Sequence, residues 1–223
     1  MKTRLSEEAI AMRAARELGD GFVVNLGFGI PTLVANYIPE QKHVLWHQEN
    51  GVVGYGHALS MEELDRADYD LVDNAGHFLS PNPGMCIVDG VDAFVMVRGG
   101  HLDATILGAL QVSAKGDLAN WMTTPDAAPG VGGAMDMAVG AKRVIVVMQH
   151  TTRDHKPKIL NKCSYPLTAV ECVNLIITDL AVVEVVADGL VLSELAPGWT
   201  VEEIQALTEP RLTVADDLRE IRL

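Results

Sequence analysis

The sequence is organised around the stretch Trp46-His47-Gln48-Glu49-Asn50-Gly51-Val52-Val53-Gly54-Tyr55-Gly56. The apolar run Val44–Trp46 predicts a short buried strand, and Glu49 follows at its end. The three glycines after Glu49 permit tight turns and close approach of a ligand to the backbone. Because α/β sheets bind ligands outside the carboxyl ends of their strands, Glu49 is a candidate nucleophile or general base. The alternative interpretation is a solvated loop acid beside a turn.

The composition indicates a folded domain with an acidic surface. The chain has 223 residues, of which 48% are hydrophobic, and these values predict one α/β domain over residues 1–223 with a substantial core. The formal net charge of −13 argues against nucleic acid and anionic membrane surfaces as partners. An anionic small ligand stays possible, because backbone N–H groups of glycine loops can bind one locally.

Neither a targeting segment nor a metal site is expected. Charged residues follow Met1 where a signal peptide would be apolar, and no apolar run approaches the ~18 residues of a membrane span. Cys86, Cys163 and Cys172 are too scattered for a disulfide framework, and no zinc-ligand spacing occurs. We therefore expect a cytoplasmic protein without a metal.

The N-terminal part predicts a helix, a strand and a glycine loop. Ser6 is a typical N-cap, and the following apolar positions repeat at helical spacing until Gly19, which is expected to end the helix. Phe22–Leu26 predicts a strand, and Gly27 and Gly29 open a turn into a short helix. Such a unit can present backbone amides to an anion, although a plain crossover turn is equally compatible with it.

A second glycine motif is Pro129-Gly130-Val131-Gly132-Gly133-Ala134-Met135-Asp136. Glycines before a short helix can form a nest of backbone N–H groups. Acyl transfer needs such donors, because negative charge develops on the carbonyl oxygen in the transition state. We expect the amides of Gly132 and Gly133 to serve this role, with an ordinary helix-start turn as the alternative.

The remaining elements follow from apolar patterns and turn signals. Strands are expected at 104–112, 144–148, 173–178 and 181–186, and 91–97 is compatible with either a helix or a strand. Asp188-Gly189 predicts a type I′ hairpin. Thr200–Glu203 has the pattern of a capping box, which opens a last helix.

Several of these motifs together resemble the B (β) subunit of family I CoA-transferases of the 3-oxoacid or 3-oxoadipate type. The resemblance covers about residues 14–212 and departs at Gln48, where the family usually has Ser, and at Phe28, where it has a smaller residue. The matching motifs are Asn25–Tyr37, Glu49-Asn50-Gly51, Asp73–Gly76, Gly99–Asp103, Leu107–Val112, Gly116–Trp121, Gly130–Asp136 and Lys158–Thr168.

The resemblance implies an open, mostly parallel α/β sheet flanked by helices, the fold shared with sugar-phosphate isomerases. It also implies that Glu49 is the nucleophile of a ping-pong reaction through a glutamyl-CoA thioester, which needs no metal or redox cofactor. CoA would move from a donor such as succinyl-CoA to 3-oxoadipate or acetoacetate. Substrate and CoA are then expected near the turn residues of the two motifs, namely Gly27, Gly29, Asn50, Gly51 and Gly54.

A partner chain is expected as well. Lys42 is the one lysine or arginine between Gly27 and Ser60, so phosphates of CoA need cations from elsewhere. The family implies an A (α) subunit and a hetero-oligomer. The loop His77–Gly84 departs most from the family and is expected to select the acid. His77 is a possible base, whereas His101 is expected to be structural.

Two other functions stay open on the residues. A sugar-phosphate isomerase of similar fold would use Glu49 as a general base and would need basic residues near the glycine loops. A non-catalytic, ligand-sensing subunit would keep the fold without needing Glu49.

Overall fold

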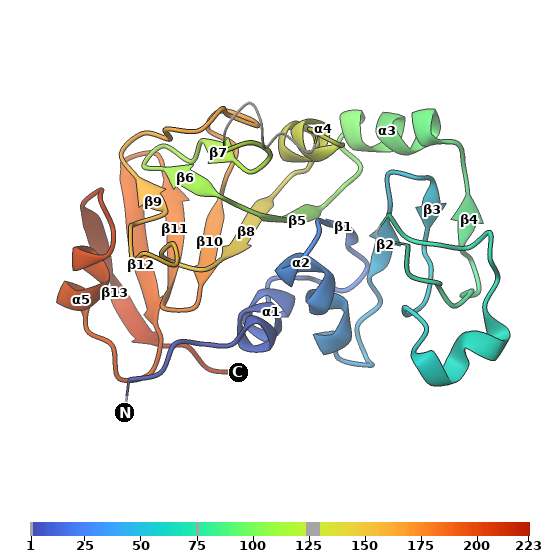
Figure 1. Cartoon of the computed structure of the whole chain (residues 1–223), viewed down its shortest axis with the longest axis horizontal. Coiled ribbons are helices and arrows are strands. Elements are labelled where there is room, and N and C mark those ends of the chain that lie inside the picture. Colours follow the sequence, from blue (N-terminus) through green and yellow to red (C-terminus); the bar gives the residue numbers. More distant parts are fainter. Residues whose placement is uncertain (1, 75, 124–129) are drawn as a thin grey trace.

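The computed structural model describes residues 2–74, 76–123 and 130–223. Its main sheet has ten strands in the order β13-β12-β11-β10-β8-β5-β1-β2-β3-β4 (Figure 1). The five neighbours from β10 to β2 are all parallel, and a smaller sheet has the order β7-β6-β9. The prediction of an open, mostly parallel sheet flanked by helices is confirmed.

The elements, in chain order, are α1 (Glu7–Ala15), β1 (Val23–Leu26), α2 (Ile30–Leu33), the 3-10 helix η1 (Val34–Tyr37), β2 (Leu45–His47), β3 (Val52–Val53), the 3-10 helix η2 (Met61–Arg66), β4 (Cys86–Ile87), α3 (Gly90–Arg98), β5 (Ala104–Gly108), β6 (Gln111–Ser113), β7 (Leu118–Ala119), α4 (Ala134–Gly140), β8 (Val144–Met148), β9 (Ile159–Leu160), β10 (Leu175–Thr178), β11 (Ala181–Val186), β12 (Gly189–Leu195), α5 (Val201–Ala206) and β13 (Leu212–Glu220).

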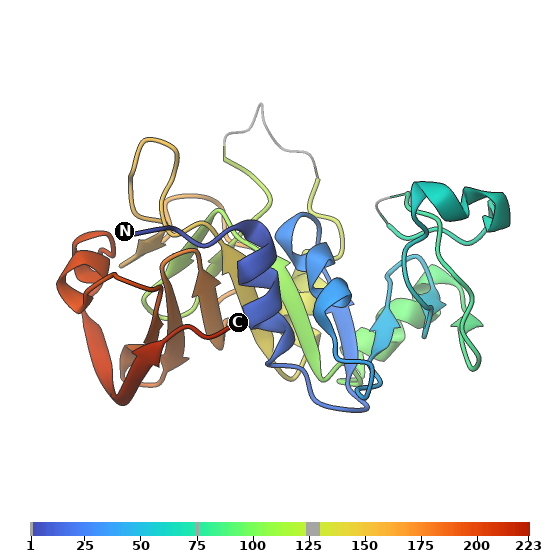
Figure 2. The ribbon, with the colours of Figure 1, turned by 90° about the horizontal axis from the view of Figure 1, so that it is seen from below.

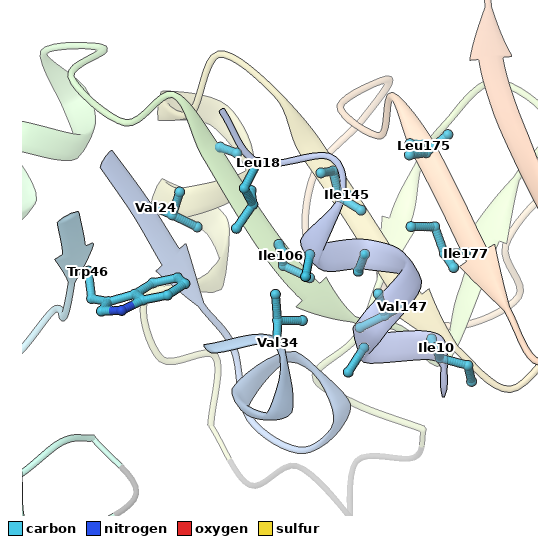
Figure 3. Packing of buried hydrophobic residues seen from close by; sticks show 14 of the residues in the cluster. Ile10, Leu18, Val24, Val34, Trp46, Ile106, Ile145, Val147, Leu175 and Ile177 are labelled. Carbon is cyan, nitrogen blue, oxygen red and sulfur yellow. The ribbon is translucent and has the colours of Figure 1, made fainter. Parts of the chain in front are cut away.

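The central strands are buried on both faces, as expected for a parallel sheet. Helices α1, α2 and η1 cover one face, where Ile10 of α1 packs with Ile106, Ile145 and Ile177 of the sheet (Figure 3). Side chains that alternate with these along the strands, such as Val146, point to the other face, which α4, α5 and the small sheet cover. The hydrophobic residues therefore form two core layers with the sheet between them.

The start of the chain follows its capping signals, but its first helix is shorter than expected. The side-chain oxygen of Ser6 accepts a hydrogen bond from the N–H of Ala9, which caps α1 as predicted. The helix ends at Ala15 rather than at Gly19. Tight turns, in which Glu17 and Leu18 donate to carbonyls three residues earlier, continue the chain to Gly19.

The apolar run 104–112 is two strands rather than the single strand expected. β5 ends at Gly108, and β6 begins at Gln111 in the small sheet, where it pairs with β7 and β9. The N–H of Leu110 donates to the carbonyl of Ala119 and so turns the chain away from the main sheet. Residues 91–97, which the sequence left open, lie in the helix α3.

The hairpin of β11 and β12 is confirmed, but its turn is not of type I′. Val186 pairs with Gly189, so Ala187 and Asp188 form the loop. A type I′ turn needs positive φ at both loop residues, and neither of them has it, whereas Gly189 has φ of 128°. The capping box of Thr200 and Glu203 is present at the start of α5, as predicted.

Strands β2, β3 and β4, together with η2, form one end of the molecule. Figure 2 shows this part at the opposite end from β13, and α3 leads from β4 back toward α4 (Figure 1). Glu49 lies in the chain between β2 and β3, so it lies where the parallel centre of the sheet meets this antiparallel end.

Candidate active site

Glu49 lies just beyond the carboxyl end of β2, as the sequence predicted, and its carboxylate faces the start of α4. The backbone N–H of Gly133 donates a hydrogen bond to it. Burial raises the pKa of Glu49, the Gly133 hydrogen bond opposes this rise, and the negative charge of Asp136 adds to it. Within the described part of the chain this carboxylate has a backbone donor and forms no ion pair, an arrangement that costs stability and is common for functional groups.

Gly133 leaves room for this carboxylate. A Cβ at Gly133 would overlap Oε2 of Glu49 and would lie 3.2 Å from the ring of Phe94. The neighbouring Gly132 has φ of 56°, in the left-handed region that favours glycine. The close approach of Glu49 to the backbone therefore depends on glycine, and α4 begins at the next residue. Pro129, the first residue of the predicted motif, lies outside the described residues.

The turn after Glu49 is tight for a different reason. Gly51 has φ of 102°, and a Cβ there would overlap the carbonyl oxygen of Val88. The carbonyl of Gly51 accepts from the N–H of Val88, which ties the turn to the start of α3. The side chain of Asn50 donates to the carbonyl of Val72. These two residues hold the backbone that carries Glu49.

A cavity of about 540 Å³, called here the Glu49 cavity, lies at the carboxyl edge of β1, β2 and β5. Among the described residues, its lining contains the two carboxylates Glu49 and Asp73 and no lysine, arginine or histidine. The lining residues are Asn25, Leu26, Gly27, Phe28, Thr32, Gln48, Glu49, Asp73, Asn74, Leu107, Gly108, Ala109, Leu110, Asn120, Trp121, Gly130, Val131, Gly132, Gly133, Ala134 and Met137.

A second cavity of about 750 Å³, called here the adjoining cavity, shares the lining residues Leu26, Thr32, Gln48 and Asp73 with the first. It extends along α2, η1 and the segment from Gly54 to Ala58, and the loop 77–84 contributes several further lining residues. The loop 77–84, which the sequence analysis expected to select the acid, thus lines the adjoining cavity.

The predicted site residues separate into two groups. Gly27, Gly132 and Gly133 line the Glu49 cavity with Glu49, and Gly54 lines the adjoining cavity. Gly29, Asn50 and Gly51 line neither cavity. Gly29 is the N-cap of α2 with φ of 79°, so its place is in a turn, as is that of the other two.

The two histidines differ in position. His77 lies at the adjoining cavity, and its Nδ1 is 2.9 Å from Oδ2 of Asp73. His101 lines neither cavity and follows the turn after α3. The Asp73–Gly76 motif is described apart from Ala75, which lies outside the described residues.

Sequence reasoning missed several residues of the site. The buried side chain of Asn25 donates to the carbonyl of His47 at 3.0 Å and joins the ends of β1 and β2. The amide of Asn120 donates to the carbonyl of Gly108 at 3.2 Å and lies next to Trp121 at the Glu49 cavity. The signal for Asn25 was a polar residue inside an apolar strand, and Asn120 lies in one of the matching motifs.

Two other kinds of site are absent from the described ranges 2–74, 76–123 and 130–223. These residues contain no group of three or more His, Cys, Asp or Glu side chains placed to hold a metal ion. No helix within them combines the length and the apolar character that crossing a bilayer requires.

Comparisons with known proteins identify the family of this chain. The family model for coenzyme A transferase matches residues 7–207. The B subunit of 3-oxoadipate CoA-transferase from Acinetobacter baylyi is 44% identical over 206 residues, covering 92% of this chain and 94% of that protein. The beta subunit of acetate CoA-transferase from Escherichia coli is 42% identical over 213 residues, covering 96% of each.

A solved structure shares the fold. The acyl-CoA transferase YdiF from Escherichia coli O157:H7 superimposes with a TM-score of 0.77 at 20% identity. The alignment covers all of this chain and 45% of that longer one. The family model and these relatives define a protein of the CoA-transferase class. The chain belongs to the coenzyme A transferase family, and the resemblance to its B subunits of 3-oxoacid type is confirmed.

Proposed function

We propose that this chain is the catalytic B subunit of a 3-oxoacid CoA-transferase and that Glu49 is its nucleophile. The observation that supports this most is the half-buried carboxylate of Glu49, to which the backbone N–H of Gly133 donates, beside a cavity whose described lining has no cation. The B and beta subunits among the relatives belong to CoA-transferases named for 3-oxoadipate and for acetate. Family membership disfavours the isomerase alternative.

The chemistry consists of two covalent exchanges. The Glu49 carboxylate attacks the thioester carbonyl of the donor, which gives an acyl-glutamyl anhydride and releases CoA thiolate. The thiolate then attacks the Glu49 carbonyl carbon, forms a glutamyl-CoA thioester and releases the donor acid. A second acid reverses both steps and leaves with CoA.

Gly133 supports the step that occurs on the protein's own carbonyl. When thiolate attacks Glu49, negative charge develops on one of the carboxyl oxygens, and the Gly133 N–H is already bound to that group. A donor that is in place before the charge develops lowers the barrier without reorganisation. Gly132 is proposed as the neighbouring donor, since a Cβ there would lie 4.0 Å from Oε1 of Glu49.

Much of the CoA-binding surface is proposed to come from an A subunit. The described lining residues of the Glu49 cavity include no cation, yet CoA carries several phosphate charges that need cationic or amide partners. The relative from Acinetobacter baylyi is named as the B subunit of its enzyme, which agrees with a heteromer. We therefore expect no transferase activity from this chain alone. No resident metal or redox cofactor is part of the proposed mechanism.

Mass spectrometry of the trapped intermediate tests the proposal. The complex with an A subunit is mixed with succinyl-CoA, denatured and digested. The peptide that contains Glu49 should gain the mass of CoA less water, and borohydride should remove the adduct and inactivate the enzyme. Glu49→Gln should give no adduct, whereas the exposed Glu62→Gln is the matched control. An adduct-free wild-type complex with full turnover would contradict the proposal, and an active chain without the A subunit would contradict its second part.

A further inference from the structure

His47, two residues before Glu49, is a buried histidine that the proposed reaction does not use. Its side chain is fully buried, and its Nε2 lies 3.1 Å from the carbonyl oxygen of Ala93 in α3. Among residues 2–74, 76–123 and 130–223, the other ring nitrogen, Nδ1, is the one buried side-chain nitrogen or oxygen without a hydrogen-bond partner. A buried polar atom that is left unpaired costs stability, so an apolar side chain would be more stable here unless the ring has a further role.

The contact with Ala93 fixes the protonation state of the ring. A carbonyl oxygen only accepts, so Nε2 carries the hydrogen and Nδ1 is the bare acceptor. Burial lowers the pKa of His47, although hydrogen bonding to the carbonyls of Ala93 and of His47 itself favours the charged form. Near pH 7 the ring is therefore a neutral donor, which places no positive charge close to the proposed nucleophile.

Helix α3, which His47 contacts, borders the surroundings of Glu49 at two further places. A Cβ at Gly90, the first residue of α3, would lie 3.6 Å from the carbonyl oxygen of Glu49. The ring of Phe94, the residue after Ala93, would lie 3.2 Å from a Cβ at Gly133. Since the N–H of Gly133 donates to the Glu49 carboxylate, α3 lies against both partners of that hydrogen bond.

We propose that His47 is a positioning residue for Glu49: its Nε2 donates to Ala93 and so holds α3 where Glu49 and Gly133 stay in contact. This inference rests on the proposed function, because the Gly133 N–H matters for rate only if negative charge develops on the Glu49 carboxyl group. His47 lines neither cavity, so it acts through α3 and not on the substrate. Displacement of a reacting group by about 1 Å is enough to lower a rate by about 10²-fold.

The test compares two substitutions of His47 in the complex with an A subunit. His47→Leu keeps a side chain of similar size that cannot donate, and it should lower kcat by roughly ten- to a hundredfold. The KM for succinyl-CoA should change by less than about twofold, since the lost contact serves the transition state and not substrate binding. His47→Gln should recover most of the rate, because its amide can donate to the carbonyl of Ala93.

His150→Leu is the matched control. His150 is equally buried, lines neither cavity, and has its ring 2.9 Å from the hydroxyl groups of Thr178 and Thr208. Its replacement should lower Tm but leave the kcat of the folded enzyme unchanged. In a double-mutant cycle, His47→Leu combined with Gly133→Ala should lower kcat by less than the product of the two single losses, because both changes act on the same contact.

Three kinetic results would overturn the inference: an unchanged kcat in His47→Leu, equal losses of kcat in His47→Leu and His150→Leu, or independent effects of His47→Leu and Gly133→Ala. If His47→Leu does not fold, nitrogen NMR of the wild-type ring decides. A neutral ring with its hydrogen on Nε2 supports the inference, whereas a protonated ring or a hydrogen on Nδ1 at pH 7 overturns it.

Thioester formation on Glu49 is followed in the same samples and separates this inference from the proposed function. If the wild-type complex forms no adduct, the proposed function fails. An adduct on Glu49 together with an unchanged kcat in His47→Leu leaves that function intact and overturns only the role of His47.

Discussion

Two acids lie at the carboxyl ends of parallel strands in this protein, and they have very different surroundings. Glu49 follows β2, lines a cavity and has the N–H of Gly133 as its donor. Asp179 follows β10, is fully buried, and accepts from the guanidinium of Arg4 at 2.7 Å and from the N–H of His150 at 2.6 Å. Both are placed by the same topology, but only one of them faces open space.

The residues around Asp179 complete a closed polar cluster. The ring of His150 lies 2.9 Å from the hydroxyl groups of Thr178 and Thr208, one on each nitrogen. Burial lowers the pKa of His150 to about 4, so the ring is neutral near pH 7. Satisfied polar groups of this kind stabilise a fold, whereas the poorly partnered Glu49 is available for chemistry. The two acids therefore differ in how many of their hydrogen-bond acceptors are already used by the protein.

The largest expected effect is the loss of turnover at the open edge. Glu49→Ala removes the proposed nucleophile and should lower kcat by about 10⁴-fold or more, as removal of a covalent nucleophile does in other enzymes. The fold should persist, because Glu49 has few partners. Steady-state assays of the complex with its A subunit and circular dichroism measure the two properties. Near-normal turnover of Glu49→Ala would mean that Glu49, like Asp179, has no role in the reaction.

A smaller loss of rate is expected at Gly133. Gly133→Ala places a methyl group where Oε2 of Glu49 lies, so the carboxylate must move away from its N–H donor. Loss of one such donor lowers kcat by about 10²- to 10³-fold. Gly130→Ala is a poor control, since Gly130 has φ of 110°, whereas Val139→Ala changes an exposed residue of α4 that lines neither cavity. Equal rates for Gly133→Ala and wild type would exclude the proposed role.

Stability, rather than rate, should respond at the closed edge. Asp179→Ala leaves Arg4 and the His150 N–H without their acceptor, and the free energy of unfolding should fall by about 2–4 kcal/mol. Arg4 is partly exposed, so the lower end of this range is expected. Urea denaturation of the isolated chain measures the change. A stable variant with reduced turnover would show that this edge also serves catalysis.

A modest change in selectivity is expected at Gln48. Gln48→Ala opens the wall between the cavities and removes the hydrogen bond to Tyr55. Branched or longer 3-oxoacids should gain roughly tenfold in relative kcat/KM, the order of one methylene in a pocket. Tyr55→Phe, which removes the hydroxyl but keeps the ring, should change the ratio less. If neither variant changes the relative kcat/KM of these acids, the wall between the two cavities does not influence which acid is used.

Local sequence signals predicted several element ends and the place of Glu49 just beyond a strand. Ser6, Thr200 and the glycines marked element ends through their own hydrogen bonds and φ values, so these predictions needed no tertiary information. Glu49 was identifiable because it follows an apolar run and precedes glycines. The reaction was suggested by the resemblance of the motifs to the CoA-transferase family, because the spacing of the residues alone left the reaction open.

Long-range contacts explain what could not be predicted. The run 104–112 changes sheets at Gly108 because β6 finds its partners in β7 and β9, and β9 begins some fifty residues later along the chain. The contact of Gly133 with Glu49 joins two motifs that are distant in sequence. Lys42 lines the adjoining cavity together with residues of η1 and of the loop 77–84. Local sequence patterns do not predict contacts between residues that are distant along the chain.

The smallest expected effect is a stability gain at Glu49, the proposed nucleophile. Burial raises the pKa of Glu49 in the folded state, so the folded protein holds that proton more tightly than the unfolded chain. The resulting stability is fully present below the unfolded pKa of about 4.3 and is lost as the pH rises through the higher folded pKa. At pH 7 the ionised carboxylate therefore destabilises the fold.

Glu49→Gln, which keeps an oxygen for the Gly133 N–H, should raise Tm by no more than about 4 °C, the shift caused by ~1 kcal/mol in a domain of this size. The gain should shrink as the pH falls toward 4, and the exposed Glu62→Gln should show no comparable gain. A Glu49→Gln protein that melts below wild type at pH 7, or a difference that is independent of pH, would mean that Glu49 is as well satisfied as Asp179.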